Sequence, residues 1–129
     1  MNIYRENILE HYKNPLNHEE MENASAEFHD SNPVCGDEIH FWVKIKEDGT
    51  IERATFKGTG CAISQASASM LTETVEGMNI DEVEEMGSEE IRELIGVPLS
   101  PVRLKCALLG LKVLQAAILK YKGENNKGE

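Results

Sequence analysis

Residues 38–57, EIHFWVKIKEDGTIERATFK, alternate apolar and polar side chains on both sides of a short polar break. In the first half every second residue is apolar, a period that is typical of a half-buried β-strand. The residues of this apolar face are Ile39, Phe41, Val43 and Ile45. Asp48-Gly49 lies in the break, and this dipeptide is a strong signal for a hairpin turn. The stretch therefore predicts two antiparallel strands, over 38–46 and 51–57.

The sequence before the hairpin predicts one helix and a polar connection. Residues 2–12 carry apolar side chains at helical spacing, and Asn14-Pro15 ends the pattern. Residues 15–34 are mostly polar and predict a connection with room for one short strand.

The sequence after the hairpin predicts four helices. Gly58-Thr59-Gly60 breaks the strand, and a helix rich in small Ala and Ser side chains follows over 61–76, so it can lie close to a neighbouring sheet. Residues 79–96 predict two short helices with Asp81 and Ser88 as N-caps.

The last predicted helix begins at Ser100-Pro101, a cap followed by a first-turn proline, and continues to Tyr121. Residues 122–129 are polar, and we expect them to form a disordered tail. The order of elements predicts an α+β fold: one domain over 1–129, with a small antiparallel sheet of about three strands and helices packed on one face.

Length and charge limit the function classes. The chain has 129 residues, the size of one ordinary domain, and 13 Lys and Arg against 23 Asp and Glu give a net charge of −10. Such a surface repels phosphate groups, so neither nucleic acid nor an anionic membrane is an expected partner. No stretch approaches the roughly 18 apolar residues of a membrane span, and the first residues lack the apolar core of a signal peptide. We therefore expect a cytoplasmic protein.

Three cysteines lie where the regular patterns break. Cys35 is in the turn before the hairpin, Cys61 is at the junction between strand and helix, and Cys106 is in the second turn of the last helix. The hairpin runs out from Cys35 and returns to Cys61, so its geometry brings these two to one end of the sheet. Asp37 is close enough to Cys35 to add a carboxylate oxygen, and the helix that begins near Cys61 favours its thiolate.

Three thiolates and one carboxylate could complete a tetrahedral site for zinc or for an iron–sulfur unit. A hard carboxylate among soft thiolates suggests a site that gives up what it binds. The absence of a C-x-x-C pair leaves a second interpretation open at this point, in which the cysteines are three unrelated buried thiols.

Three segments carry a family resemblance: NPVCGD at 32–37, GTGCAISQASAS at 58–69 and PVRLKCA at 101–107. Together they resemble the signature stretches of the IscU/NifU-N family of iron–sulfur cluster assembly scaffolds, to which the SufU proteins also belong. The resemblance implies a SufE/NifU-like architecture. It also implies that Cys35, Asp37, Cys61 and Cys106 are the ligands of a [2Fe–2S] cluster, later a [4Fe–4S] cluster, or of zinc in the same site.

The resemblance implies a scaffold rather than an enzyme, with two kinds of partner. A cysteine desulfurase of the IscS, NifS or SufS type supplies sulfur as a persulfide, and apo iron–sulfur proteins accept the finished cluster. Cys35 and Cys106 are both candidates for the sulfur acceptor, and the sequence does not choose between them. The alternative is a SufU-like zinc-dependent sulfurtransferase, and a purely structural zinc domain is a weaker third interpretation.

Two positions depart from the IscU pattern. Lys105 stands where IscU has a histidine; SufU proteins carry a basic residue there, and this lysine could stabilise the Cys106 thiolate. The short gap of 106 − 61 = 45 positions is instead IscU-like. Ser100 interrupts the Leu-Pro-Pro-Val-Lys motif of IscU proteins that a dedicated Hsp70 chaperone serves, so that partnership is not predicted.

The four histidines have no recognisable ligand spacing, and we expect them to have surface or capping roles. They are His11, His18, His29 and His40.

Overall fold

The computed structural model describes residues 3–33 and 36–126, which form three strands and five helices. In chain order these elements are α1 (Ile3–Lys13), β1 (Ala26–Asn32), β2 (Asp37–Ile45), β3 (Ile51–Thr59), α2 (Ala62–Val75), α3 (Ile80–Glu85), α4 (Ser88–Ile95) and α5 (Pro101–Asn126).

The strands form one antiparallel sheet in the order β1-β2-β3. In the register, Phe41 of the central strand lies opposite Phe28 on one side and Phe56 on the other. The Asp48 side chain accepts a hydrogen bond from the Thr50 amide at 2.9 Å and closes the turn between β2 and β3. The predicted hairpin is confirmed, and β1 supplies the third strand.

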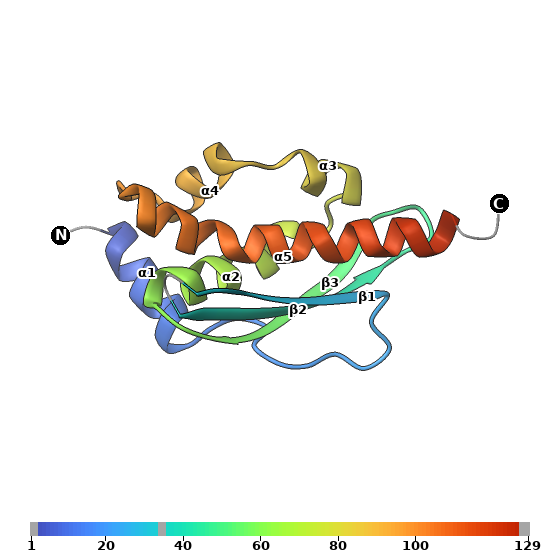
Figure 1. Cartoon of the computed structure of the whole chain (residues 1–129), viewed down its shortest axis with the longest axis horizontal. Helices are drawn as coiled ribbons and strands as arrows, with labels where there is room; N and C mark the ends of the chain where they lie inside the picture. Colours follow the sequence, from blue (N-terminus) through green and yellow to red (C-terminus); the bar gives the residue numbers. More distant parts are fainter. Residues whose placement is uncertain (1–2, 34–35, 127–129) are drawn as a thin grey trace.

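Helices cover one face of this sheet (Figure 1). α5 packs on β1 and β2, α2 packs on β3, and α1 lies against α2 at one end of the molecule. α3 and α4 lie on the far side of α5 from the sheet. Between the layers is a core of fully buried side chains that includes Phe41, Phe56, Leu71 and Leu114. The predicted α+β architecture is confirmed.

Small side chains let α2 approach α5 closely as well as the sheet. The side chains of Ala66, Ser67 and Ala68 are fully buried. The Ser67 hydroxyl donates a hydrogen bond of 2.7 Å to the carbonyl of Ala107 in α5. A Cβ at Gly110 would lie 3.5 Å from the Cα of Ala68, so little space remains between the two helices.

The connection at residues 14–25 runs along the edge strand and beneath the other face of the sheet (Figure 1). The carbonyl of Asn17 accepts a hydrogen bond from the Phe56 amide at 3.0 Å, and the ammonium of Lys44 donates to the carbonyl of Asn23, also at 3.0 Å. Trp42 and Thr55 point to this face and are nevertheless buried. Strand alternation gave the direction of Trp42 correctly but not its burial.

Three predicted boundaries are wrong, two helix starts and one helix end. The N-caps of α3 and α4 are Asn79 and Gly87 rather than Asp81 and Ser88. Asn79 accepts a hydrogen bond from the Asp81 amide at 2.9 Å, and its own amide donates to the Glu82 carboxylate at 3.1 Å. This reciprocal pair is a capping box, which stabilises a helix start two residues earlier than a lone aspartate indicates.

The third wrong boundary is the end of the last helix. α5 continues past Tyr121 to Asn126, so residues 122–126 are helical where the sequence predicted a disordered tail. Lys122 forms ion pairs with Asp81 and Glu84 and thereby ties this part of α5 to α3. Residues 127–129 of the expected tail are outside the described residues. Within the described ranges, no helix has the length and apolar character needed to cross a bilayer.

Candidate metal centre

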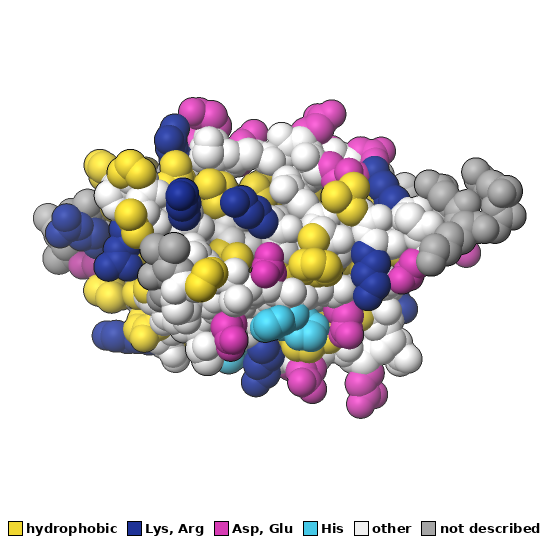
Figure 2. Space-filling model, in the orientation of Figure 1, with side chains coloured by type: hydrophobic (Ala, Val, Ile, Leu, Met, Phe, Trp, Pro, Cys, Tyr) yellow, Lys and Arg dark blue, Asp and Glu magenta, His cyan; other side chains and the backbone are white. Residues whose placement is uncertain are grey.

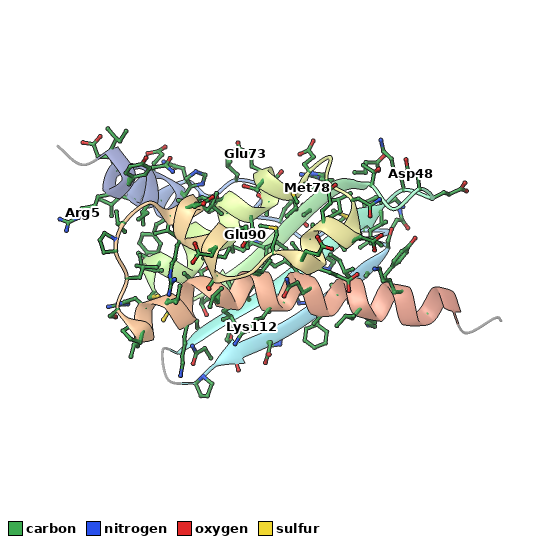
Figure 3. All side chains as sticks on the ribbon, turned by 90° about the horizontal axis from the view of Figure 1, so that it is seen from above. Arg5, Asp48, Glu73, Met78, Glu90 and Lys112 are labelled. Carbon is green, nitrogen blue, oxygen red and sulfur yellow. The ribbon has the colours of Figure 1, made fainter. Side chains whose placement is uncertain are left out.

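Asp37, Cys61 and Cys106 come together at the end of the sheet where β2 begins and β3 ends. Each offers one ligand atom, and the three atoms lie within 4.8 Å of one another. The hairpin turn is at the other end: Asp48, in that turn, and Arg5, on α1, mark opposite ends of the long axis in Figure 3. Three separate elements therefore supply one site, since Asp37 opens β2, Cys61 precedes α2 and Cys106 is in α5.

The Asp37 carboxylate is completely buried. Its Oδ1 accepts a hydrogen bond from the Cys61 amide at 2.7 Å, and its Oδ2 lies 3.7 Å from the Cys61 Sγ. Neither of these partners carries a positive charge, Asp37 forms no ion pair with any residue that the structure describes, and a buried carboxylate without a cation is costly in free energy. A bound metal ion would supply the missing positive charge.

Gly60 makes room for this carboxylate. Its φ of +135° lies outside the range that L side chains favour, and a Cβ there would lie 2.1 Å from the Asp37 Oδ1. The space beside this glycine is therefore filled by the Asp37 carboxylate. The sequence did not predict this contact between Gly60 and Asp37. The one feature that could have indicated it is the position of Gly60 directly before Cys61.

Cys61 is the N-cap of α2. Its Sγ accepts a hydrogen bond of 3.4 Å from the Ser64 amide in the first turn of the helix. The Cys61 side chain is partly exposed, whereas Cys106 is fully buried. The convergence of these two cysteines on Asp37 argues against the interpretation that they are unrelated core thiols.

Cys35 and Lys105 complete the set of predicted site residues. Cys35 lies outside the described residues, so its place among the ligands stays a prediction. Lys105 is exposed on α5 and forms no ion pair with any residue in the described part of the chain. Its proposed effect on the Cys106 thiolate also stays a prediction.

A surface cavity of about 540 Å³ adjoins Cys61. It lies between α1, the start of α2 and the segment before α5, and Arg5 and Arg103 contribute to its lining. The remaining lining residues are apolar: Ile8, Leu9, Ala62, Ile63, Val97, Pro98 and Leu99. Apolar and basic side chains also gather at this end of the molecule in Figure 2. The cavity borders the partly exposed side of the candidate metal centre.

The donor set selects among metals. Thiolates with one carboxylate suit zinc and iron–sulfur units, whereas Mg²⁺ and Ca²⁺ prefer sites made only of oxygen. The fold is a three-stranded sheet under helices, with a carboxylate and two cysteines gathered at one end as a candidate metal centre.

Comparison with known proteins identifies the family. The model of the NifU-like N-terminal domain matches residues 3–128, and the chain belongs to this family. It is 38% identical over 140 residues to the zinc-dependent sulfurtransferase SufU of Bacillus subtilis (strain 168), covering 95% of this chain and 94% of the relative. It is 34% identical over 124 residues to the iron–sulfur cluster assembly scaffold protein IscU of Escherichia coli (strain K12), covering 94% and 95%.

A solved structure agrees with the fold. The crystal structure of FiSufU from the thermophile Fervidobacterium islandicum AW-1 superimposes with a TM-score of 0.77 at 29% identity, covering 88% of this chain and 94% of that one. The predicted family resemblance is confirmed, and relatives from both its IscU and its SufU branch match nearly the whole chain.

Proposed function

We propose that this chain is a scaffold on which an iron–sulfur cluster is assembled and from which it passes to acceptor proteins. One observation carries the proposal: the Asp37 carboxylate, which forms no ion pair within the described part of the chain, is buried beside Cys61 and Cys106, at a site that is partly open to a surface cavity. The names of the IscU relatives support the same function.

The proposed ligands are Asp37, Cys61 and Cys106, with Cys35 as the fourth, and the proposed cargo is a [2Fe–2S] cluster that later gives [4Fe–4S]. Thiolates bind iron strongly, whereas a carboxylate oxygen is a harder ligand that exchanges more readily with a competing group. A mixed donor set of this kind suits assembly followed by release.

Sulfur would arrive from a cysteine desulfurase. A scaffold thiolate attacks the outer sulfur of the donor's persulfide, the donor's S–S bond breaks, and the donor cysteine leaves as a thiolate. The scaffold cysteine then carries the persulfide. Cys35 and Cys106 remain the candidates, and Cys106 is fully buried, so acceptance there requires the first turns of α5 to move.

The second candidate function is a zinc-dependent sulfurtransferase. Two observations favour it: Lys105 adjoins Cys106 where IscU has histidine, and the chain is 38% identical to the Bacillus subtilis SufU. In this case zinc occupies the same ligands, and a cysteine freed from zinc takes the sulfur and passes it on.

An anaerobic assembly reaction separates the two functions. The protein is incubated with ferrous iron, cysteine, a reductant and a cysteine desulfurase, then desalted and assayed for iron, acid-labile sulfide and zinc. The scaffold function predicts that iron and sulfide are bound in equal amounts. The Cys61→Ser variant should lose both, whereas the control variant Ser31→Ala, on the exposed end of β1, should keep them. Retained zinc without sulfide, together with faster cysteine turnover by the desulfurase, would establish the sulfurtransferase instead.

A further inference from the structure

A second group of metal-ligating side chains lies on β1 and β2, on the face of the sheet that is turned away from α5. Glu27 and His29 are two residues apart on β1, so they point to the same face. His40 of β2 lies directly opposite His29 in the register, with the two ring centroids 5.8 Å apart. In Figure 2, histidine side chains gather at the level of these strands with acidic side chains on either side.

His40 is held in place with one nitrogen unused. Its ring stacks on Trp42 with the centroids 3.9 Å apart and an interplanar angle of 6°, which fixes the plane of the imidazole. The Nε2 atom of this ring is buried and has no hydrogen-bond partner among the residues that the structure describes. Its nearest acidic neighbour is the Glu27 Oε2 at 3.6 Å, which is longer than a hydrogen bond.

The distance between these two atoms fits a shared metal ion. Ligands bound at about 2.0–2.2 Å to one tetrahedral zinc ion lie roughly 3.3–3.6 Å apart. The 3.6 Å between the His40 Nε2 and the Glu27 Oε2 falls at the upper end of this range. Two histidines and one glutamate are also an established donor set for zinc with an open fourth position.

We propose that Glu27, His29 and His40 form a second binding site, for a divalent transition cation of the zinc type. His29 is exposed, so it can change rotamer to bring its ligand atom to an ion held by Glu27 and His40. Lys57 lies opposite His40 on β3 and is the nearest cation in the register. Its positive charge lowers the affinity of the site for a cation. Strand alternation turns His40 away from the face that Asp37 shares with Ile39, so the site is separate from the candidate metal centre.

Zinc titration with histidine NMR tests the proposal in the intact chain. The imidazole C–H signals are followed while zinc alone is added beyond the first equivalent, which the thiolate site takes. His11 and His18 serve as internal controls, because His11 is hydrogen-bonded to the Ser69 hydroxyl and His18 packs on Phe56. We expect the signals of His29 and His40 to change saturably with the second equivalent while the control signals stay fixed.

Three variants test the ligands by calorimetry. Loss of one ligand should weaken the second zinc site about tenfold or more, since even groups behind the ligands change metal affinity by about 10–100-fold. We expect this result for His29→Ala and Glu27→Gln. Asp30→Asn removes the same charge from the same strand on the opposite face and should leave the affinity unchanged. Binding of only one equivalent, or equal weakening by Glu27→Gln and Asp30→Asn, would overturn the proposal.

Discussion

At the scale of single residues, the candidate metal centre depends on how Asp37 is held. Its carboxylate is fixed by the Cys61 amide and enclosed by Gly60, so it faces the thiols in one orientation. The same side chain therefore serves two purposes, since it joins β2 to the start of α2 and offers an oxygen ligand. Substitutions around Asp37 should affect metal binding more than they affect folding.

Gly60→Ala tests this packing. The added Cβ would meet the Asp37 carboxylate, and a positive φ costs an alanine about 1–3 kcal/mol. Gly77→Ala is a matched control, because its φ of +89° imposes a similar strain while nothing lies within 4 Å of the new Cβ. We expect both variants to lose stability in urea, and only Gly60→Ala to lose zinc affinity in calorimetry. Equal zinc affinities in the two variants would contradict the role given to Gly60.

His18 gives the fold a pH dependence. Burial, followed by the nearby charge of Lys57, lowers the pKa of His18 below its ordinary value of 6.5. As the pH falls below 6.5, His18 is protonated in the unfolded chain before it is protonated in the folded chain. The free energy of unfolding is therefore highest above pH 6.5 and decreases as the pH drops. Melting temperatures measured between pH 7.5 and 5.5 should therefore fall less in His18→Gln than in the wild type. Parallel curves would contradict this assignment.

At the scale of elements, α5 connects the sheet to the short helices. Gln115 of α5 donates hydrogen bonds to the carbonyls of Val83 at 3.0 Å and Met86 at 2.9 Å, at the end of α3. Helix ends carry carbonyls without partners inside the helix, so this side chain acts as a cap supplied by another element. It holds α3 against the face of α5 that is turned away from the sheet.

Gln115→Leu should lower the free energy of unfolding by about 1–3 kcal/mol, because the Met86 carbonyl loses its side-chain donor while the Val83 carbonyl keeps only the Met86 amide. The comparison is Lys112→Leu, an exposed position on the same helix that is labelled in Figure 3. Urea denaturation gives the stabilities, and hydrogen exchange should become faster in α3 for Gln115→Leu alone. Unchanged hydrogen exchange in α3 would contradict the role of Gln115 in holding this helix.

At the scale of the whole molecule, the core is complete without the candidate metal centre. The fully buried side chains between sheet and helices include Phe41, Phe56, Leu71, Leu114 and Ile118, and none of them belongs to the site. A protein whose fold depends on zinc unfolds when the metal is removed. Metal at this site should therefore add stability only through the free energy of its binding to the folded state.

Removal of zinc with a chelator distinguishes a fold that is stable without metal from a structural zinc domain. After complete zinc removal, the far-ultraviolet circular dichroism should stay the same while the melting temperature falls modestly. Adding back stoichiometric zinc should restore the melting temperature. Loss of the helical signal on chelation would mean that the metal is structural.

The sequence predicted the hairpin and the meeting of its two ends because both depend on local signals. Alternation and Asp48-Gly49 fix β2 and β3, and their antiparallel pairing places Asp37 beside Cys61. The register of β1 has no such signal, since Phe28 is the only large apolar residue of this strand. Surface roles were therefore expected for His29 and His40, which the structure places directly opposite each other.

Contacts between distant helices were equally hidden from the sequence. The ion pairs of Lys122 with α3 join residues about 40 positions apart, and no local pattern predicts them. They explain why the last helix is longer than its apolar pattern indicated. Cys35 lies outside the described residues, so the complete ligand set of the candidate metal centre rests on the sequence.

Cluster transfer from the loaded protein to an apo-ferredoxin is the most direct test of the proposed scaffold function. The protein is loaded anaerobically, desalted and mixed with the apo-ferredoxin in the presence of an iron chelator, which captures any free iron. Wild type should transfer iron and sulfide together, and Asp37→Ala should keep its cluster and transfer more slowly, because the exchangeable oxygen ligand is gone. Iron that passes to the chelator without reaching the ferredoxin, or faster iron loss from Asp37→Ala than from wild type, would contradict the account.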